Sequence, residues 1–140
     1  MKTHPYLNFD GKAEEAFDFY RTVFGGEFTT KMRMADGPGS EKLAEEDRDR
    51  IMHISLPIDE GTVLMASDIM PSMGQKLTEG NNMYIMLAPD SREEAKRLFD
   101  QLSKGGEVEM PLEDQFWGDY FGSFTDKFGI RWMVDIESEK

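Results

Sequence analysis

An internal repeat is the feature of this 140-residue sequence that most limits its fold. Three short patterns occur in the first half and return in the same order after an offset of 78 to 80 residues. They are an apolar run that starts with Tyr, an acidic pair followed by Ala, and Gly-Gly-Glu. The patterns begin at Tyr6, Glu14 and Gly25, and again at Tyr84, Glu93 and Gly105. The shared order and spacing indicate two halves with the same secondary structure.

Each half contains one predicted amphipathic helix. From Ala13 to Phe24 the apolar residues recur every three or four positions, and Gly25 follows as a C-cap. In the second half Ser91 is placed to cap a helix whose first turn contains Glu93 and Glu94, where acidic side chains are favourable. The apolar stripe of this second helix consists of Ala95, Leu98, Phe99 and Leu102.

Alternating side chains predict the strands. In residues 50–56, one face contains Met52, Ile54 and Leu56, and the other contains Ile51, His53 and Ser55. Thr62–Asp68 follows after a Glu-Gly turn, which predicts a hairpin. In the closing strand, residues 130–136, one face contains Ile130, Trp132, Val134 and Ile136. The other face contains Arg131, Met133 and Asp135.

These elements predict an α+β protein with the order βαβββ, a linker, and βαβββ again. We expect a first module over residues 1–70, a linker over 71–81 and a second module over 82–140, within one structural domain. Residues 35–49 are rich in Gly, Pro and acidic residues, which predicts a mobile loop. Helices on one side of a sheet leave its other face free to curve around a ligand. We therefore expect a curved mixed sheet around a cup, with the helices on the outer face.

Composition excludes several classes of function. The formal net charge is -12, which argues against a nucleic-acid partner because phosphate backbones are repelled. Cysteine is absent, so neither disulfides nor thiolate chemistry is expected. The sequence has neither an apolar run long enough for a membrane helix nor an apolar stretch at its start. We expect a cytoplasmic protein without a membrane or nucleic-acid partner.

Motifs along nearly the whole chain resemble PhnB-like proteins of the glyoxalase / bleomycin resistance / dioxygenase (vicinal oxygen chelate) superfamily. They lie at residues 5–11, 16–20, 23–26, 65–68, 116–118 and 125–132. The resemblance implies the doubled βαβββ layout and a homodimer. The chain has no glycine-rich loop for a methyl-donor cofactor, so we do not expect a methyltransferase.

The superfamily's metal site provides a test of function. In metal-dependent relatives the ligands are His or Gln and then Glu, from the first and fourth strands of each half. Aligned by strand pattern with one extra residue allowed in the turn after the first strand, these positions fall on His4, Met65, Tyr84 and Met133. Without that extra residue the first position falls on Pro5. Thioethers are soft ligands that suit copper(I) better than zinc or magnesium. We therefore predict no metal site and no cofactor, with Asp68 or Asp135 as alternative ligands if the register differs.

Strand parity predicts the side chains that line the cup. They are Tyr6, Asn8, His53, Ser55, Met65, Ser67, Tyr84, Met86, Arg131 and Met133. Trp117 is a further candidate, which could stack on a ligand at the mouth of the cup or serve as a hydrophobic plug or dimer contact. This set is mostly apolar with a few hydrogen-bonding groups, which is typical of small-molecule sites.

The sequence is compatible with three functions. The first is a metal-independent small-molecule-binding protein, for which His53 is the leading polar contact because its reference pKa lies near neutrality. Arg131 either clamps an anionic ligand or pairs with an acidic neighbour. The second is a divalent-metal-dependent lyase, isomerase or dioxygenase. The third is a non-catalytic interaction module whose cup is filled by its own side chains.

Overall fold

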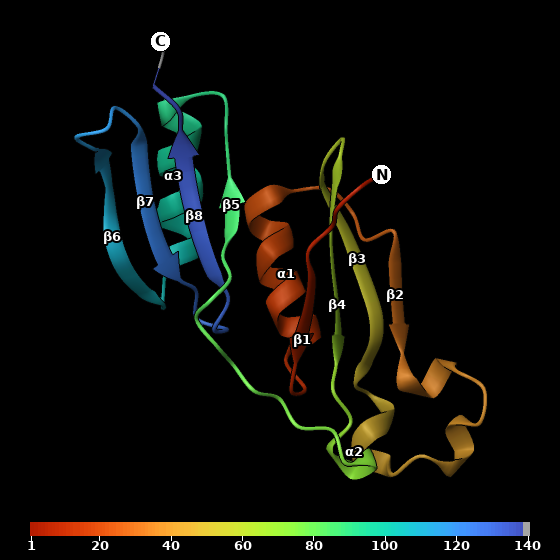
Figure 1. Cartoon of the computed structure of the whole chain (residues 1–140). Helices are drawn as coiled ribbons and strands as arrows, with labels where there is room; N and C mark the ends of the chain where they lie inside the picture. The colour runs from red at the N-terminus through yellow and green to blue at the C-terminus, as the bar shows by residue number, and fades with distance from the viewer. Residues whose placement is uncertain (139–140) are drawn as a thin grey trace. The chain divides into compact units, whose positions relative to one another are not determined.

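The computed structural model describes residues 1–138 and divides into two compact units, Met1–Thr78 and Glu79–Lys140. Figure 1 shows the elements of both units. The boundary falls between residues 78 and 79, inside the segment expected as a linker.

The first unit is a four-stranded mixed sheet with one long helix. The strands are β1 (Tyr6–Phe9), β2 (Thr30–Arg33), β3 (Ile51–Asp59) and β4 (Thr62–Asp68), in the sheet order β1-β4-β3-β2. β1 runs parallel to β4, whereas the β3 pairings with β2 and β4 are antiparallel. Helix α1 (Ala13–Phe24) connects β1 to β2 and packs on one face of this sheet (Figure 1).

The apolar stripe of α1 provides half of the core of the first unit. Its Ala13, Ala16, Phe17, Tyr20 and Val23 are buried. They face a sheet surface whose buried residues include Leu7, Phe9, Ile54, Leu56, Leu64 and Ala66. Packing of one apolar helix stripe on one apolar sheet face buries the apolar surface of both elements, as expected. The opposite face of the sheet contains the exposed Tyr6 and Asn8 and the half-buried His53.

A bulge in β3 corrects the predicted faces of that strand. Met32 pairs with His53, but the next residue of β2, Arg33, pairs with Ile51, so Met52 is an extra residue on β3. A bulge of this kind reverses the alternation of side chains beyond it. As a result Ile51 is buried with the core, while Met52 is half-exposed. The prediction that Ile51 shares a face with His53, and Met52 with Ile54, is wrong.

The segment between β2 and β3 also differs from the prediction. Residues 35–49 were expected to form an irregular loop. The structure has three short helices there, η1 (Met34–Asp36), η2 (Ser40–Lys42) and α2 (Glu45–Arg48). A fourth short helix, η3 (Pro71–Met73), follows β4. Their lack of a long apolar period explains why sequence reasoning missed them, since single helical turns carry almost no periodic signal.

The second unit repeats the same order. It contains β5 (Ile85–Leu87), α3 (Arg92–Ser103), β6 (Glu107–Asp114), β7 (Tyr120–Thr125) and β8 (Arg131–Ile136), with sheet order β5-β8-β7-β6. Ser91 caps α3 as predicted, because its hydroxyl accepts a hydrogen bond from the Glu94 amide at 3.1 Å. Trp132 and Val134 of β8 are fully buried, and the Trp132 indole donates to Asp126 at 2.9 Å.

The α+β class and the repeated βαβββ order are confirmed. The chain forms two four-stranded mixed sheets, neither of which closes on itself. The two long helices, α1 and α3, have 12 residues each. Within residues 1–138, no helix is long and apolar enough to span a bilayer.

Candidate functional site

A pocket of about 530 Å³ lies in the first unit, beside the ends of β1 and β4. Its apolar lining consists of Met34, Met52, Ile69 and Met70. Its polar lining consists of Asn8, Ser67, Asp68, Gln75 and Lys76. This volume lies in the usual range for small-molecule sites, whereas the lining, with five polar and four apolar residues, is more polar than that of most such sites.

Strand register explains why these residues meet. Asn8 of β1 pairs with Ser67 of β4, so both side chains point to the same face of the sheet. The β3 bulge turns Met52 toward the pocket instead of the core. Met34 comes from η1, and residues 69–76, which follow β4, form the remaining wall.

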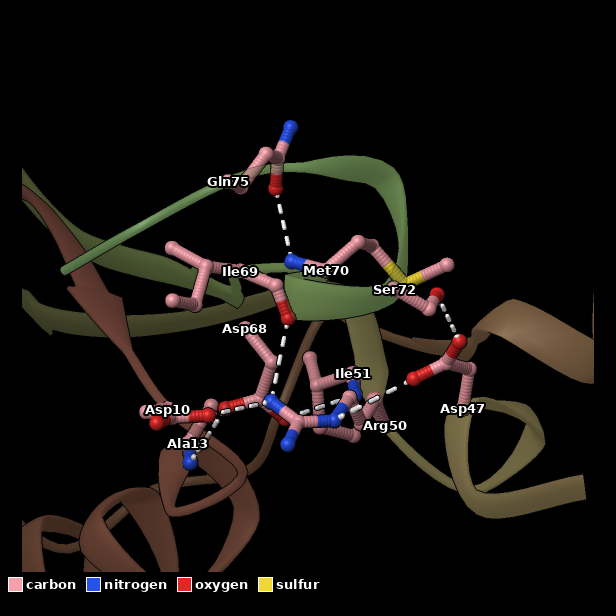
Figure 2. Close-up of polar contacts among 10 residues, drawn as sticks. All are labelled: Asp10, Ala13, Asp47, Arg50, Ile51, Asp68, Ile69, Met70, Ser72 and Gln75. Carbon is pink, nitrogen blue, oxygen red and sulfur yellow. Dashed lines mark hydrogen bonds and ion pairs between the residues drawn. The ribbon is translucent and has the colours of Figure 1, made fainter. Parts of the chain in front are cut away.

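An arginine at the base of this wall ties several elements together (Figure 2). Arg50 donates from Nη1 to the Asp10 carboxylate at 2.8 Å and to the Ile69 carbonyl at 3.0 Å. Its Nε also lies 3.7 Å from Asp47 Oδ1. Arg50 thereby fixes the start of the wall to the turn before α1 and to α2.

Two further hydrogen bonds hold the wall in place, and both are drawn in Figure 2. The Ser72 hydroxyl donates to Asp47 Oδ2. The Met70 amide donates to the Gln75 side-chain carbonyl at 2.6 Å, which closes a loop over residues 70–75. Because these contacts come from the protein itself, the wall is preformed.

Asp68 has a structural role. It is buried, and its two carboxylate oxygens accept hydrogen bonds from the amides of Ala13 at 3.0 Å and Ile51 at 2.8 Å. Ala13 is the first residue of α1, so Asp68 caps this helix from a distant strand. Both oxygens are engaged by the backbone, which compensates the buried charge locally.

A chain of three polar side chains lies on the same face of the sheet as Asn8. The His53 imidazole has the Tyr6 hydroxyl 3.1 Å from Nδ1 and the Ser55 hydroxyl 2.8 Å from Nε2. Met65 lies between them in the sheet, paired with both Tyr6 and Ser55. A neutral imidazole donates from one nitrogen and accepts at the other, and hydroxyls suit either direction. A shift of tautomer therefore lets Tyr6 present either a donor or an acceptor to a bound molecule.

The second unit has a charged cluster that consists of Tyr84, Glu109 of β6 and Arg131 of β8. Arg131 donates to Glu109 at 3.0 Å, and the Tyr84 hydroxyl donates to the same carboxylate at 3.0 Å. The Arg131 guanidinium also lies 5.8 Å from the centre of the Tyr84 ring. Of the two roles considered for Arg131, the structure shows the pairing with an acidic neighbour.

The remaining candidates also belong to the second unit. Met86 pairs with Met133 across β5 and β8, and Met86 is exposed. Trp117, between β6 and β7, packs edge-on against Phe116 with ring centres 5.1 Å apart. Its ring lies 6.0 Å from that of Phe121.

Asp135 is the unusual acid of the second unit. It is buried, and its Oδ1 atom has no hydrogen-bond partner among the described residues. Burial, followed by a hydrogen bond and charge repulsion from Asp119, raises the pKa of Asp135 to about 6. This carboxyl therefore holds its proton to a higher pH than an exposed aspartate.

Comparison with known proteins identifies the family. The family model of the Glyoxalase/Bleomycin resistance protein/Dioxygenase superfamily matches residues 3–134. The chain belongs to this superfamily. It is 39% identical to protein PA1353 from Pseudomonas aeruginosa, over 99% of both chains and with a TM-score of 0.87.

Two further solved structures are similar to this chain. The PhnB protein from Bacillus cereus is 27% identical, with a TM-score of 0.77 over 98% of this chain and 100% of that one, which confirms the predicted resemblance. The fosfomycin resistance protein FosX from Listeria monocytogenes, solved with Mn(II) and sulfate, has a TM-score of 0.63. FosX is 14% identical over 99% of this chain and 93% of its own, a likeness that concerns the fold alone.

At the four positions where the resemblance places metal ligands, the donor groups of this chain do not fit a divalent ion. Nδ1 of His4 accepts a hydrogen bond from the Val63 amide at 3.0 Å, so the proton of the neutral ring is on Nε2 and neither lone pair is free. The other three expected ligand positions are Met65, Tyr84 and Met133. Within residues 1–138, no three His, Cys, Asp or Glu side chains are grouped to hold a metal ion.

The residues that the sequence predicted to line the ligand-binding cup lie in separate groups in the structure. Asn8 and Ser67 line the pocket, and Tyr6, His53, Ser55 and Met65 lie on the same sheet face. Met34, Met52, Ile69, Met70, Gln75 and Lys76 were missed. Met52 was assigned to the core by simple alternation, and residues 71–81 were interpreted only as a linker. The high methionine content, 11 residues, was the one available signal.

Proposed function

We propose that this superfamily member is a metal-independent small-molecule-binding protein whose site includes the pocket of the first unit. The observation that carries this proposal is the pocket itself, with a volume of about 530 Å³ and a preformed wall. A preformed site binds more tightly because fewer side chains lose freedom when the ligand arrives.

The polar chain of Tyr6, His53 and Ser55 supports a directional contact beside the pocket. Along β1, Tyr6 lies two residues from Asn8, a lining residue, so their side chains project from the same face. In this proposal the apolar part of the ligand contacts the methionines and a polar group of the ligand contacts Tyr6. The second-unit candidates Tyr84, Met86, Trp117, Arg131 and Met133 stay predicted contacts.

The metal-independent part of the proposal rests on the donor groups. Both oxygens of Asp68 accept backbone hydrogen bonds, and both nitrogens of His53 lie against hydroxyl groups. The metal-dependent lyase, isomerase or dioxygenase is the alternative, and the free oxygen of Asp135 is the observation that favours it. The interaction module with a filled site is disfavoured by the volume of the pocket.

We also propose a cytoplasmic homodimer, as expected from the sequence. The exposed Phe116 and the half-exposed Trp117 support a protein contact in the second unit, because exposed aromatic pairs are enriched at interfaces. Light scattering on the full chain and on a Phe116→Ser, Trp117→Ser double variant tests this. A monomer at micromolar concentration in the unaltered chain contradicts the dimer.

A thermal-shift screen of metabolites and planar drugs, with and without EDTA, tests the function. A binder without a metal gives the same rise in melting temperature in both conditions, because ligand binding stabilises only the folded state. Elemental analysis of the purified protein should find less than stoichiometric zinc, manganese, iron or nickel. Stoichiometric metal together with a chelator-sensitive melting temperature rejects the proposal in favour of the metal-dependent enzyme.

A further inference from the structure

We infer that the first-unit pocket selects an apolar, preferably aromatic, monoanion whose charged group lies against Lys76 and Gln75. This inference rests on the proposed binding function and specifies the chemistry of its ligand. It is based on the charged and hydrogen-bonding groups of the pocket lining that have no partner within the described residues.

The pocket lining contains one available charge. Of its nine residues, Asp68 and Lys76 are the two that ionise. Asp68 is 5% exposed and its oxygens accept hydrogen bonds from the Ala13 and Ile51 amides. Lys76, by contrast, is exposed and forms no hydrogen bond or ion pair with residues 1–138. The cation of Lys76 is therefore the charged group that a ligand meets.

Gln75, the preceding residue in the chain, adds a donor to the lining. Its side-chain carbonyl is engaged by the Met70 amide at 2.6 Å, which orients the other end of the amide away from the wall (Figure 2). The free end is an NH₂ group, which donates hydrogen bonds. An ammonium and an amide donor on adjacent residues match a carboxylate or sulfonate.

The two acids beside the wall, Asp10 and Asp47, already have partners of their own. Asp47 accepts from Ser72 and pairs with Arg50, and Asp10 accepts from Arg50 (Figure 2). The net charge of -12 on the chain acts at longer range, and salt screens it beyond about 8 Å at physiological ionic strength. Recognition of the anion therefore depends on direct contact with Lys76 and Gln75.

The apolar side of the pocket indicates the body of the ligand. Met34, Met52 and Met70 place three flexible thioethers around it. Methionine adapts its shape to a ligand and makes favourable contacts with aromatic rings. A flat aromatic ligand with one negatively charged group can contact the methionines with its ring and Lys76 and Gln75 with its charge.

Two fluorescent probes test this inference, and they differ mainly in charge. The anion is 1-anilinonaphthalene-8-sulfonate, and the neutral probe is N-phenyl-1-naphthylamine. Affinity for each is measured by titration with the full chain, the Lys76→Gln and Gln75→Glu variants, and Lys104→Gln as a control. Lys104 is an exposed lysine of the second unit with no ion pair among the described residues. Melting curves verify that each variant is folded.

Lys76→Gln should weaken binding of the anion by roughly threefold to tenfold, the range for one partly exposed charge contact. The neutral probe should keep its affinity within about twofold, since it makes only the apolar contacts. Gln75→Glu keeps an acceptor for the Met70 amide but adds a negative charge, so it too should weaken only the anion. Lys104→Gln should change neither affinity.

An Asn8→Trp variant separates the two possible failures. Asn8 is exposed on an edge strand, and a Trp there fills part of the pocket. If Asn8→Trp removes binding of both probes but Lys76→Gln and Gln75→Glu affect both probes equally or neither, the anion inference is overturned and the proposed binding function stands. If Asn8→Trp leaves both affinities unchanged, the pocket is not the binding site and both proposals fail.

Discussion

The Tyr6 hydroxyl and the His53 imidazole meet at 3.1 Å although their strands, β1 and β3, are separated in the sheet by β4. Met65 of β4 pairs with Tyr6 on one side and with Ser55 on the other, and the ring centres of Tyr6 and His53 lie 5.6 Å apart. Behind the imidazole, the buried Ser55 hydroxyl lies 2.8 Å from its other nitrogen. The exposed end of this chain of groups is the Tyr6 hydroxyl, and that is the end a ligand can reach.

Replacing His53 tests whether this chain takes part in binding. His53→Ala should weaken binding of a polar pocket ligand by about fivefold, because one oriented hydrogen bond contributes about 1 kcal/mol. Isothermal titration calorimetry measures the change, and the melting temperature should stay close to that of the unaltered chain. His4→Ala is the matched control, since His4 is the only other histidine. Equal affinity in both variants removes His53 from the site.

Asp68 should matter for stability. Asp68→Ala leaves two backbone amides without acceptors and removes the cap of α1, with an expected cost of about 2–4 kcal/mol in the free energy of unfolding. Urea denaturation followed by circular dichroism measures this loss. Asp18→Ala, at an exposed position of α1, should change the free energy of unfolding by less than about 0.5 kcal/mol. A loss at Asp68 no larger than the loss at Asp18 contradicts the capping role.

Glu14 should stabilise the fold above acidic pH. Hydrogen bonds from Arg33 and then Lys31 lower the pKa of Glu14 from 4.5 to about 2. A carboxyl with a lowered folded-state pKa contributes stability above its unfolded pKa and loses it as the pH falls toward the folded value. Melting temperatures of the unaltered chain should therefore fall between pH 4.5 and pH 2 more steeply than those of Glu14→Gln. Parallel curves for the two proteins reject this role.

Asp135 should have the opposite effect on stability. Its pKa is raised from 3.8 to about 6, so the folded state binds the proton more tightly than the unfolded state. The resulting stabilisation is complete below pH 3.8 and is lost as the pH rises to about 6. Asp135→Asn should remove this dependence and raise the melting temperature at pH 7.5 relative to the unaltered chain.

The control for Asp135 is Asp90→Asn, which changes an exposed acid of the same unit. It should keep the pH dependence of the unaltered chain between pH 4 and pH 7.5. If Asp135→Asn lowers the melting temperature at pH 7.5, the carboxylate is favourably held at that pH and the raised pKa is wrong.

Sequence periodicity by itself determined most of the fold. The stripe from Ala13 to Val23, the cap at Ser91 and the alternation in β8 all depend on neighbours a few residues away, and the structure has each of them. The repeat extended these local patterns to a doubled βαβββ order. Such features are predictable because the period of a helix or strand is a property of the local backbone.

Only the tertiary structure determines which residues come together to form the pocket. One extra residue in β3 moves Met52 from the predicted core face to the pocket, and alternation contains no sign of such a bulge. The wall of residues 69–76 depends on Arg50 and Asp47, which lie about twenty or more residues earlier in the chain. Gln75 and Lys76 line the same pocket as Met34, which lies far from them in the chain, and residue patterns do not encode contacts of that range.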